Sequence, residues 1–364
     1  MINPSDTARI TPPRAALPHR VEARLIDWSP FLLILVPLLA GASLVAGFGS
    51  PELQSMVTLL LIRVVTVLGL YIFIGNSGII SFGQVTFMAI AAYASAWQTC
   101  CEALKPMVMS GLPAFLLDRS LPIWVSASTS TALAAAAAFV VGLVLMRLSG
   151  LAASISTLAV LFVWNTVYSN WDSVTMGTGS IVGLPTFVTV PVAAAGAAIA
   201  LLIAFLYQRS RWGLLLRASR EDEVAAKAAG VSLYWSRLIA FTISGAVMGM
   251  AGVMQAHFVG TISVDSYFLD LTFITLAMLI VGGMRSMAGA VVGVIVIQAV
   301  TEIFRWLESG VEIAGTTLAL PSGVQELVLS GAMLVVLMYR REGIIGAREF
   351  SIANLKRKKL RARQ

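Results

Sequence analysis

The feature that most constrains this chain is a series of continuous apolar runs, most of them close to 20 residues long, that recur between residues 31 and 339. A helix needs roughly 20 such residues to cross the hydrocarbon core of a bilayer. Within lipid, every backbone polar group must find a partner inside the structure, so only helices or a closed barrel can span the membrane. The runs are continuous rather than alternating, which favours helices over a barrel.

Composition agrees with this interpretation. Only 12% of the residues are charged, whereas a soluble domain carries about 25%, and the mean hydropathy is +0.88. The chain is therefore predicted to be an all-α, polytopic helical bundle in a membrane. We expect about ten transmembrane helices, with nine or eleven left open because the third run opens with GNSG and the ninth is short. The expected spans are 31–49, 53–74, 77–97, 122–146, 150–168, 186–207, 237–259, 267–284, 289–305 and 323–339.

The distribution of positive charge predicts the orientation. Lys and Arg residues beside transmembrane helices stay in the cytoplasm. With both termini cytoplasmic, most of the 25 basic residues fall on the inner side, and the outer loops hold only Lys105 and Arg119. The bundle, residues 30–340, then lies between an N-terminal tail, 1–29, and a basic C-terminal tail, 341–364, which is expected to contact anionic membrane lipids. No nucleic-acid partner is expected, because no folded reading module accompanies the charge.

The longest inner loop, 208–236, contains the charged, alanine-rich stretch RASREDEVAAKAAG at 217–230. Its serine and acidic residues have the features of a helix start, because a hydroxyl caps free amides and carboxylates favour the positive helix end. We expect one helix of about ten residues that begins at Ser219 and is ended by Gly230. A helix this short and charged must lie across the cytoplasmic mouth rather than in the bilayer. Its small alanine face favours close approach of another protein, although a solvated connector or an interfacial helix is the alternative.

Four stretches in order resemble one family of transporters. RASREDEVAAKAAGVSLYWSRLIAF (217–241) is similar to the cytoplasmic loop of ABC-importer permeases, in the M-subunit form of the branched-chain amino-acid (Liv-type) family. GNSGIISFGQVTFMAIAAYASA (75–96) resembles the glycine-rich stretch of that family after its second span. TMGTGSIVGLP (175–185) resembles its outer loop without the usual paired glycines, and AHFVGTISVDSYFLDLTFITLAMLIVGGMRSMAGAVVGV (256–294) resembles its late block. The resemblance extends from about residue 53 to residue 340.

The resemblance implies a permease subunit of an ABC importer for branched-chain or related small amino acids in the bacterial inner membrane. Its implied partners are a second, H-like permease subunit, two ATPase subunits and an extracytoplasmic (periplasmic) substrate-binding protein. The implied ATPase-coupling residues are Ser219, Arg220, Glu221, Asp222, Glu223, Ala225, Ala226 and Gly230. No G-x-x-x-x-G-K-[ST] phosphate loop occurs in the sequence, so we expect no enzyme and no cofactor here, with ATP bound by the partner subunits. The exact substrate is left open, because relatives in the family also move urea, short amides and other amino acids. A homodimeric or heterodimeric permease pair is also left open.

Polar residues within the spans are candidates for the translocation pathway. Arg63, in the second span, either holds a substrate carboxylate or partners an acid; a structural pair or a snorkelling side chain is the equal alternative. The small polar residues beside the irregular start of the third span form a plausible gate or pore wall, unless their glycines serve only close helix contact. These residues are Asn76, Ser77, Ser81 and Gln84.

The remaining intramembrane groups favour structural roles. Glu302 and Arg305 are three residues apart on one helix and are expected to form a local ion pair. His257 is expected to be a satisfied or interfacial histidine, because no second ligand stands at metal spacing and no metal site is predicted. With so few acidic groups or histidines at membrane depth, an ion-gradient-driven secondary transporter of small polar solutes is the runner-up hypothesis.

Overall fold

The fold is known from a computed structural model, which describes residues 20–100, 105–117, 120–308, 311–313, 316–318, 331, 338 and 343–346. Eight helices in these ranges are long and apolar enough to cross a membrane. They are α1 (Arg20–Phe48), α2 (Pro51–Ser77), α6 (Ile123–Leu145), α7 (Gly150–Ser169), α9 (Val190–Arg209), α12 (Leu233–Val259), α13 (Leu269–Gly282), preceded by the 3-10 turn η1 (Asp265–Tyr267), and α14 (Met287–Glu308). The predicted all-α, polytopic membrane bundle is confirmed.

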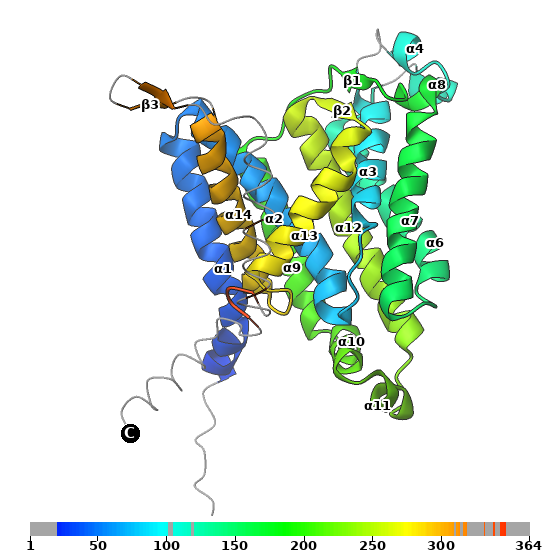
Figure 1. The fold of residues 1–364 in the computed structure, drawn as a ribbon, viewed down its shortest axis with the longest axis vertical. Helices are drawn as coiled ribbons and strands as arrows, with labels where there is room; N and C mark the ends of the chain where they lie inside the picture. The colour runs from blue at the N-terminus through cyan, green and yellow to red at the C-terminus, as the bar shows by residue number, and fades with distance from the viewer. Residues whose placement is uncertain are drawn as a thin grey trace, which may run out of the picture.

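The shorter elements gather at the two ends of the bundle. Figure 1 shows α4 (Lys105–Val108), α8 (Asp172–Thr175), β1 (Ser180–Val182) and β2 (Thr261–Ser263) at one end, and α10 (Arg211–Glu221) and α11 (Glu223–Ala228) at the other. Strands β1 and β2 pair antiparallel, as do β3 (Val311–Ile313) and β4 (Thr316–Leu318). Two further helices are shorter than the eight candidate spans: α3 (Gln84–Thr99) and α5 (Ala114–Leu117). The end that carries α10 and α11 is the one that the distribution of basic residues assigns to the cytoplasm.

One expected span is shorter in the structure than predicted, and another lies almost entirely outside the described residues. The third, expected over 77–97, forms a helix only from Gln84, because residues 78–83 leave the helical conformation after Gly78. Figure 1 shows the chain running from the lower end of α2 as a coil to α3, which lies in the upper half of the bundle. The tenth, 323–339, lies outside the described residues apart from two single positions, as do residues 1–19 and almost all of the basic C-terminal tail.

Helix α12 is the centre of the packing, since it lies against α2, α3 and α6. Its glycines are the reason these helices approach so closely. A Cβ atom on Gly252 would lie 1.9 Å from the carbonyl oxygen of Met88 on α3, and one on Gly245 would lie 2.3 Å from the Cβ of Ala138 on α6. Close contact through small residues is the usual way in which helices associate in lipid.

Helix α6 meets this core with a stripe of small residues, one in every four along the helix. They are Ser126, Ser130, Ala134, Ala138 and Gly142. The other faces of α6 are open, with Trp124 75% exposed and Val140 62% exposed. One face of the serine–threonine run at 127–131 and one face of the polyalanine at 134–138 thus belong to the packing surface.

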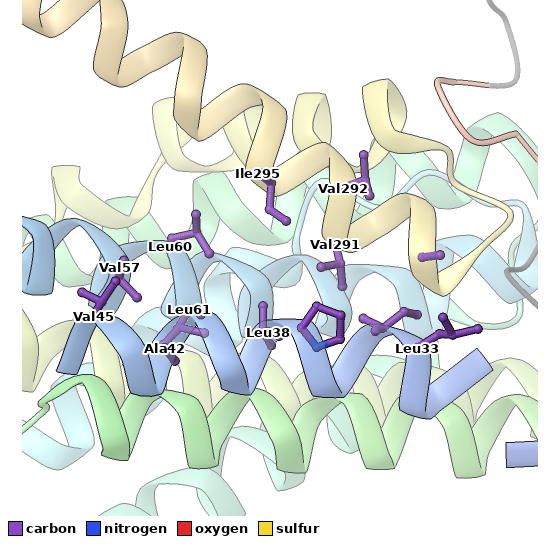
Figure 2. Close-up of a pocket in the computed structure, with 14 residues that line it drawn as sticks. Leu33, Leu38, Ala42, Val45, Val57, Leu60, Leu61, Val291, Val292 and Ile295 are labelled. Carbon is purple, nitrogen blue, oxygen red and sulfur yellow. The ribbon is translucent and has the colours of Figure 1, made fainter. Parts of the chain in front are cut away.

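An apolar groove of about 400 Å³ runs between α1, α2 and α14 (Figure 2). Side chains such as Leu38 from α1, Leu61 from α2 and Val291 from α14 line it, and no charged residue is among them. A groove with this lining suits an acyl chain or an apolar side chain. It offers no polar partner to a charged solute, whereas the buried polar residues beside α2 and α3 do.

Candidate functional site

The predicted single helix over 219–230 is wrong, because two helices with a sharp break occupy this loop. Helix α10 begins at Arg211, where the Ser210 hydroxyl accepts a hydrogen bond from the Gly213 N–H (3.2 Å). Ser219 therefore lies within α10, is buried and donates to the carbonyl of Leu216 at 2.7 Å. The residue that starts the second helix is Asp222, whose carboxylate accepts hydrogen bonds from the N–H groups of Val224 and Ala225.

The second helix, α11, projects from the end of the bundle (Figure 1). Val224 is 78% exposed, and Ala225 is exposed beside it, whereas Ala226 faces inward and is 7% exposed. Gly230 has φ = 81°, a left-handed conformation that glycine adopts readily, and it stops the helix as predicted. The tip thus exposes an apolar side chain among small residues, and another protein can approach such a surface closely.

Glu223 fixes α11 to the bundle. Its carboxylate bonds Lys227 on the same helix and Arg237 on α12, each at 3.0 Å. The pair with Lys227 has the usual helical spacing of four residues. The hydrogen bond from Lys227 lowers the pKa of Glu223, and the nearby charge of Arg237 lowers it further. Burial raises the pKa and offsets only part of this shift. The contact with Arg237, whose side chain is 8% exposed, could not be read from helical spacing because it crosses the loop.

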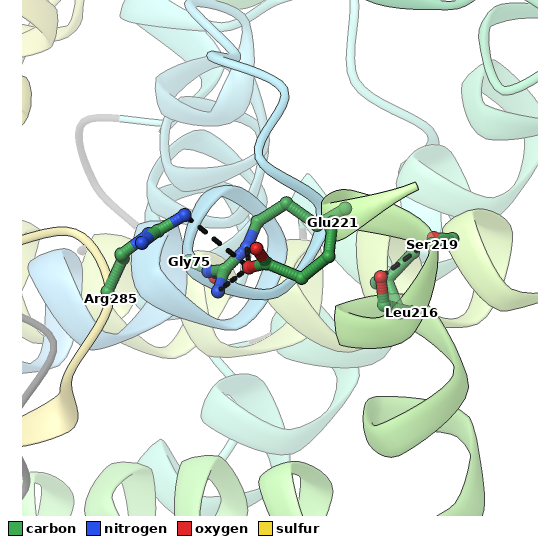
Figure 3. A network of polar contacts seen from close by, with 6 residues as sticks. Gly75, Leu216, Ser219, Glu221 and Arg285 are labelled. Carbon is green, nitrogen blue, oxygen red and sulfur yellow. Dashed lines mark hydrogen bonds and ion pairs between the residues drawn. The ribbon is translucent and has the colours of Figure 1, made fainter. Parts of the chain in front are cut away.

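Arg220 fixes α10 to the bundle in a different place. Its Nη1 donates to the carbonyl oxygen of Gly75 at 2.6 Å, near the C-terminal end of α2. Its Nε and Nη2 donate to Glu221, which also pairs with Arg285 (3.4 Å) on the turn between α13 and α14. Figure 3 shows Arg285, Gly75 and Glu221 close together, with dashed lines that meet at the carboxylate of Glu221. The guanidinium group of Arg220 and the carboxylate of Glu221 together join α10 to the end of α2 and to the turn between α13 and α14, all on the side that charge assigns to the cytoplasm.

The coil that follows α2, residues 78–83, is held at both ends. At its start, Gly78 has φ = 73° and lies against the side chain of Arg220. At its end, the Phe82 N–H donates to the hydroxyl of Thr157 on α7 (3.2 Å), and a Cβ atom on Gly83 would lie 2.3 Å from the Thr157 carbonyl oxygen. Irregular backbone at membrane depth is tolerated where protein surrounds it, and this coil meets that condition.

The four polar residues predicted beside this coil are all buried, and the structure brings them into one short segment. Asn76 donates to the Ile72 carbonyl (2.9 Å), and the Ser77 hydroxyl accepts from the Ile79 N–H (3.2 Å). The hydroxyl of Ser81 and both amide atoms of Gln84 have no hydrogen-bond partner. Leaving a buried polar group unpaired costs about 1–3 kcal/mol, so these groups are candidates to bind water or a polar solute.

Arg63 lies elsewhere on α2, about 20 Å from Asn76 along the helix axis at 1.5 Å per residue. Its side chain is partly buried, with Tyr267 close enough to interact electrostatically, and its Nε and Nη1 atoms have no hydrogen-bond partner. Within the described residues no acid pairs with it. The structural ion pair that was one alternative for Arg63 is thus not found there, and a role for this arginine in the pathway stays a prediction.

The other intramembrane groups are satisfied locally. The Nδ1 of His257 donates to the Pro185 carbonyl (2.9 Å), and its Nε2 accepts from the Ser95 hydroxyl. Glu302 and Arg305 form the predicted ion pair at 3.3 Å. Among the described residues there is no group of three or more His, Cys, Asp or Glu side chains arranged to hold a metal ion. Both predictions of structural roles are confirmed.

The chain was compared with known proteins. Residues 53–338 match the profile of a family described as "Branched-chain amino acid transport system / permease component". The chain is 24% identical to the high-affinity branched-chain amino acid transport system permease protein LivM of Escherichia coli (strain K12). It is 23% identical to the Salmonella typhimurium protein of the same name. Both alignments cover 92% of this chain and 79% of the relative. It is 27% identical to the probable branched-chain amino acid transport permease protein LivH of Methanocaldococcus jannaschii, over 49% of this chain and 53% of that protein. No solved structure matches the chain.

Proposed function

Because this chain belongs to the family of branched-chain amino acid transport system permease components, we propose that it is a permease subunit of an ABC importer, M-like, in the bacterial inner membrane. Its substrate class would be branched-chain or related small amino acids. It would form part of the translocation pathway beside a second, H-like permease subunit. An extracytoplasmic binding protein would deliver the substrate, and two separate ATPase subunits would supply the energy.

The observation that carries this proposal is the form of the α10–α11 loop. A permease without its own ATPase needs a surface that a separate ATPase can bind. That surface must be joined to the transmembrane helices. The tip of α11 offers the first property, since Val224 is 78% exposed and the small residues Ala225 and Ala228 are exposed on the same helix. Ion pairs and hydrogen bonds through Glu223 and Arg220 supply the second. A solvated connector needs neither property.

The coil at 78–83, with its unpartnered Ser81 and Gln84, is the part of the pathway we propose to move during transport. Helix α3 starts after this coil with Gly83 as its N-cap, which provides no side-chain hydrogen bond to the first turn. Free N–H groups at such a start favour negative charge. An amino acid carries a carboxylate, so a broken helix with a polar entrance suits the proposed substrate class.

Co-purification tests the docking of ATPase subunits. A tagged chain is purified from its own membranes in mild detergent, and ATP hydrolysis in the eluate is measured per mole of permease. Changing Val224 to Glu places a charge on the centre of the proposed contact and is expected to remove most of the ATPase activity. Val182 is an apolar residue of similar kind, 55% exposed at the opposite end of the bundle. Its change to Glu serves as the matched control and is expected to leave the activity in place.

Two outcomes of this experiment contradict the proposal. Wild-type eluates without ATP hydrolysis would show that no ATPase assembles with this chain. An equal loss in the two variants would show that the loss comes from general disruption rather than from a contact at α11. Uptake that persists after ATP depletion and collapses with the ion gradient would favour the secondary transporter instead.

A further inference from the structure

Arg220 lies on the loop that we propose to contact the ATPase, yet its side chain points into the bundle. It is 18% exposed, whereas the next side chain, Glu221, is 63% exposed. The guanidinium group reaches the carbonyl oxygen of Gly75, a residue 145 positions earlier in the chain, at 2.6 Å. A short bond of this kind between a cation and a carbonyl is stronger than a neutral hydrogen bond. Arg220 therefore belongs to the interior side of the loop rather than to its docking surface.

The acceptor is well suited to this contact. Gly75 lies in the last turn of α2, where carbonyl groups have no partner within the helix and carry the negative end of the helix dipole. Glu221 holds the rest of the guanidinium group through Nε (3.3 Å) and Nη2 (3.0 Å), so Nη1 is left pointing at α2. The orientation of Arg220 is thus set by its neighbour and does not depend on Gly75 alone.

A second contact lies one turn further on. A Cβ atom on Gly78 would stand 2.6 Å from the Cγ and 3.0 Å from the Cδ of Arg220. Only a residue without a side chain lets the backbone pass this close to the arginine stem, and Gly78 also has φ = 73°. Arg220 therefore contacts the end of α2 at two points, by a hydrogen bond to Gly75 and by packing against Gly78.

Movement of the α10–α11 loop can enter the bundle through several contacts, and two of these lead to the central helices α12 and α2. The route through Glu223 and Arg237 enters α12, whose glycine contacts leave almost no free space against α3 and α6. The route through Arg220 enters the end of α2 and the coil at 78–83, which has no helical hydrogen-bond ladder to resist bending. Because a coil bends more easily than a packed helix, we expect movement of the loop to displace this second path further. The path leads to Ser81 and Gln84, whose side-chain polar atoms have no hydrogen-bond partner.

We propose that Arg220 is a positioning residue that passes movement of the α10–α11 loop to the coil at 78–83 and so opens the buried polar segment around Ser81 and Gln84. The inference rests on the proposed function, since it needs an ATPase that moves the loop. It adds a specific link within the permease: the hydrogen bond to Gly75 together with the packing on Gly78.

The experiment compares Arg220→Ala with Arg217→Ala in the complete transporter in proteoliposomes. Arg217 lies on the same helix and also donates to a carbonyl at 2.6 Å, but its acceptor is Gln208 at the end of α9. We measure co-purified ATPase, ATP hydrolysis and uptake in each. Arg220→Ala is expected to keep the ATPase and its hydrolysis, and to lower uptake per ATP about ten-fold, as the loss of one charge-assisted hydrogen bond predicts. Arg217→Ala is expected to change this ratio less than about two-fold.

Unchanged uptake per ATP in Arg220→Ala, or an equal fall in both variants, would overturn the inference while leaving the proposed function in place. Absence of ATPase from the wild-type preparation would overturn the proposed function first. If Arg220→Ala does not accumulate in the membrane, Arg220→Lys is used, because it keeps the charge but cannot bond Gly75 and Glu221 together. The lysine variant is expected to show a lower uptake per ATP than wild type, and full coupling in it would overturn the inference.

Discussion

Helix α11 has only six residues, Glu223–Ala228, and is far too short to be stable alone. Its stability must come from its cap and from the ion pairs of Glu223. Changing Glu223 to Gln keeps the shape of the side chain and removes its charge, so the pairs with Lys227 and Arg237 are both lost. We expect α11 to open more often in this variant while the transmembrane bundle keeps its structure.

The size of the effect follows from the exposure of the three groups. An exposed ion pair contributes about 0.2–1 kcal/mol, whereas breaking a buried pair costs about 3–5 kcal/mol. The side chain of Arg237 is 8% exposed and that of Glu223 is 34% exposed, so their pair lies between these limits. After discounting for solvent screening, we expect Glu223→Gln to lower the free energy of local unfolding by about 1–2 kcal/mol. Lys227 is 62% exposed, and Lys227→Met should cost less than about 0.5 kcal/mol.

Hydrogen–deuterium exchange read by mass spectrometry measures this local unfolding. Since 1.36 kcal/mol corresponds to a factor of ten, exchange in α11 should be about 5–30 times faster in Glu223→Gln and about twofold faster in Lys227→Met. Exchange in α12 beyond its first turns should not change. Equal exchange in Glu223→Gln and wild type, or the same acceleration in both variants, would refute the assignment of Arg237 as the main anchor of α11.

Three further predictions follow from the same structure. The pKa of Glu223 is lowered, chiefly by the hydrogen bond from Lys227 and also by Arg237. Its ion pairs therefore stabilise α11 fully above the ordinary carboxyl pKa of about 4.3. Protection of α11 from hydrogen exchange, corrected for intrinsic rates, should hold at neutral pH and fall only as the pH drops through the lowered pKa. Gly252→Ala places a Cβ atom 1.9 Å from a backbone oxygen and should lower the thermal midpoint by an amount equivalent to about 1–3 kcal/mol. Gly41 has nothing within 4 Å of its Cβ position, so Gly41→Ala should leave the midpoint unchanged. Equal midpoints in the two variants would contradict the close packing of α12 on α3. Arg63→Met removes a charge whose Nε and Nη1 have no partner, so stability by thermal shift should be kept or raised while uptake falls; a destabilised variant with normal uptake would assign Arg63 a structural role.

The helical bundle could be predicted because its signal is local. Continuous apolar runs of sufficient length determine spans without any knowledge of their partners, and the glycine and alanine patterns of α6 and α12 indicate close packing by spacing alone. The break before α3 was also visible, since GNSG at 75–78 offers poor helix formers. Its extent was not, because residues 79–83 contain ordinary apolar residues whose coil conformation depends on Thr157 of α7.

The loop shows where sequence reasoning fails. Ser219 and Asp222 are both competent to cap a helix, but Ser219 lies inside α10, which begins at Arg211, so Asp222 caps the next helix. The contacts from Arg220 to Gly75 and from Arg237 to Glu223 join residues far apart along the chain. Helical spacing has no information about such contacts. The paired glycines at 75 and 78 were the available signal, because each leaves room for a neighbour at the end of α2.

Reconstitution tests the central claim most directly. The purified chain is placed in proteoliposomes by itself, and then with the second permease subunit, the ATPase subunits and the binding protein, and uptake of a labelled branched-chain amino acid is followed with and without internal ATP and magnesium. The account predicts no uptake by the single chain under either an ATP supply or an ion gradient, and ATP-dependent uptake by the full set. Transport by the single chain down an imposed ion gradient would contradict it.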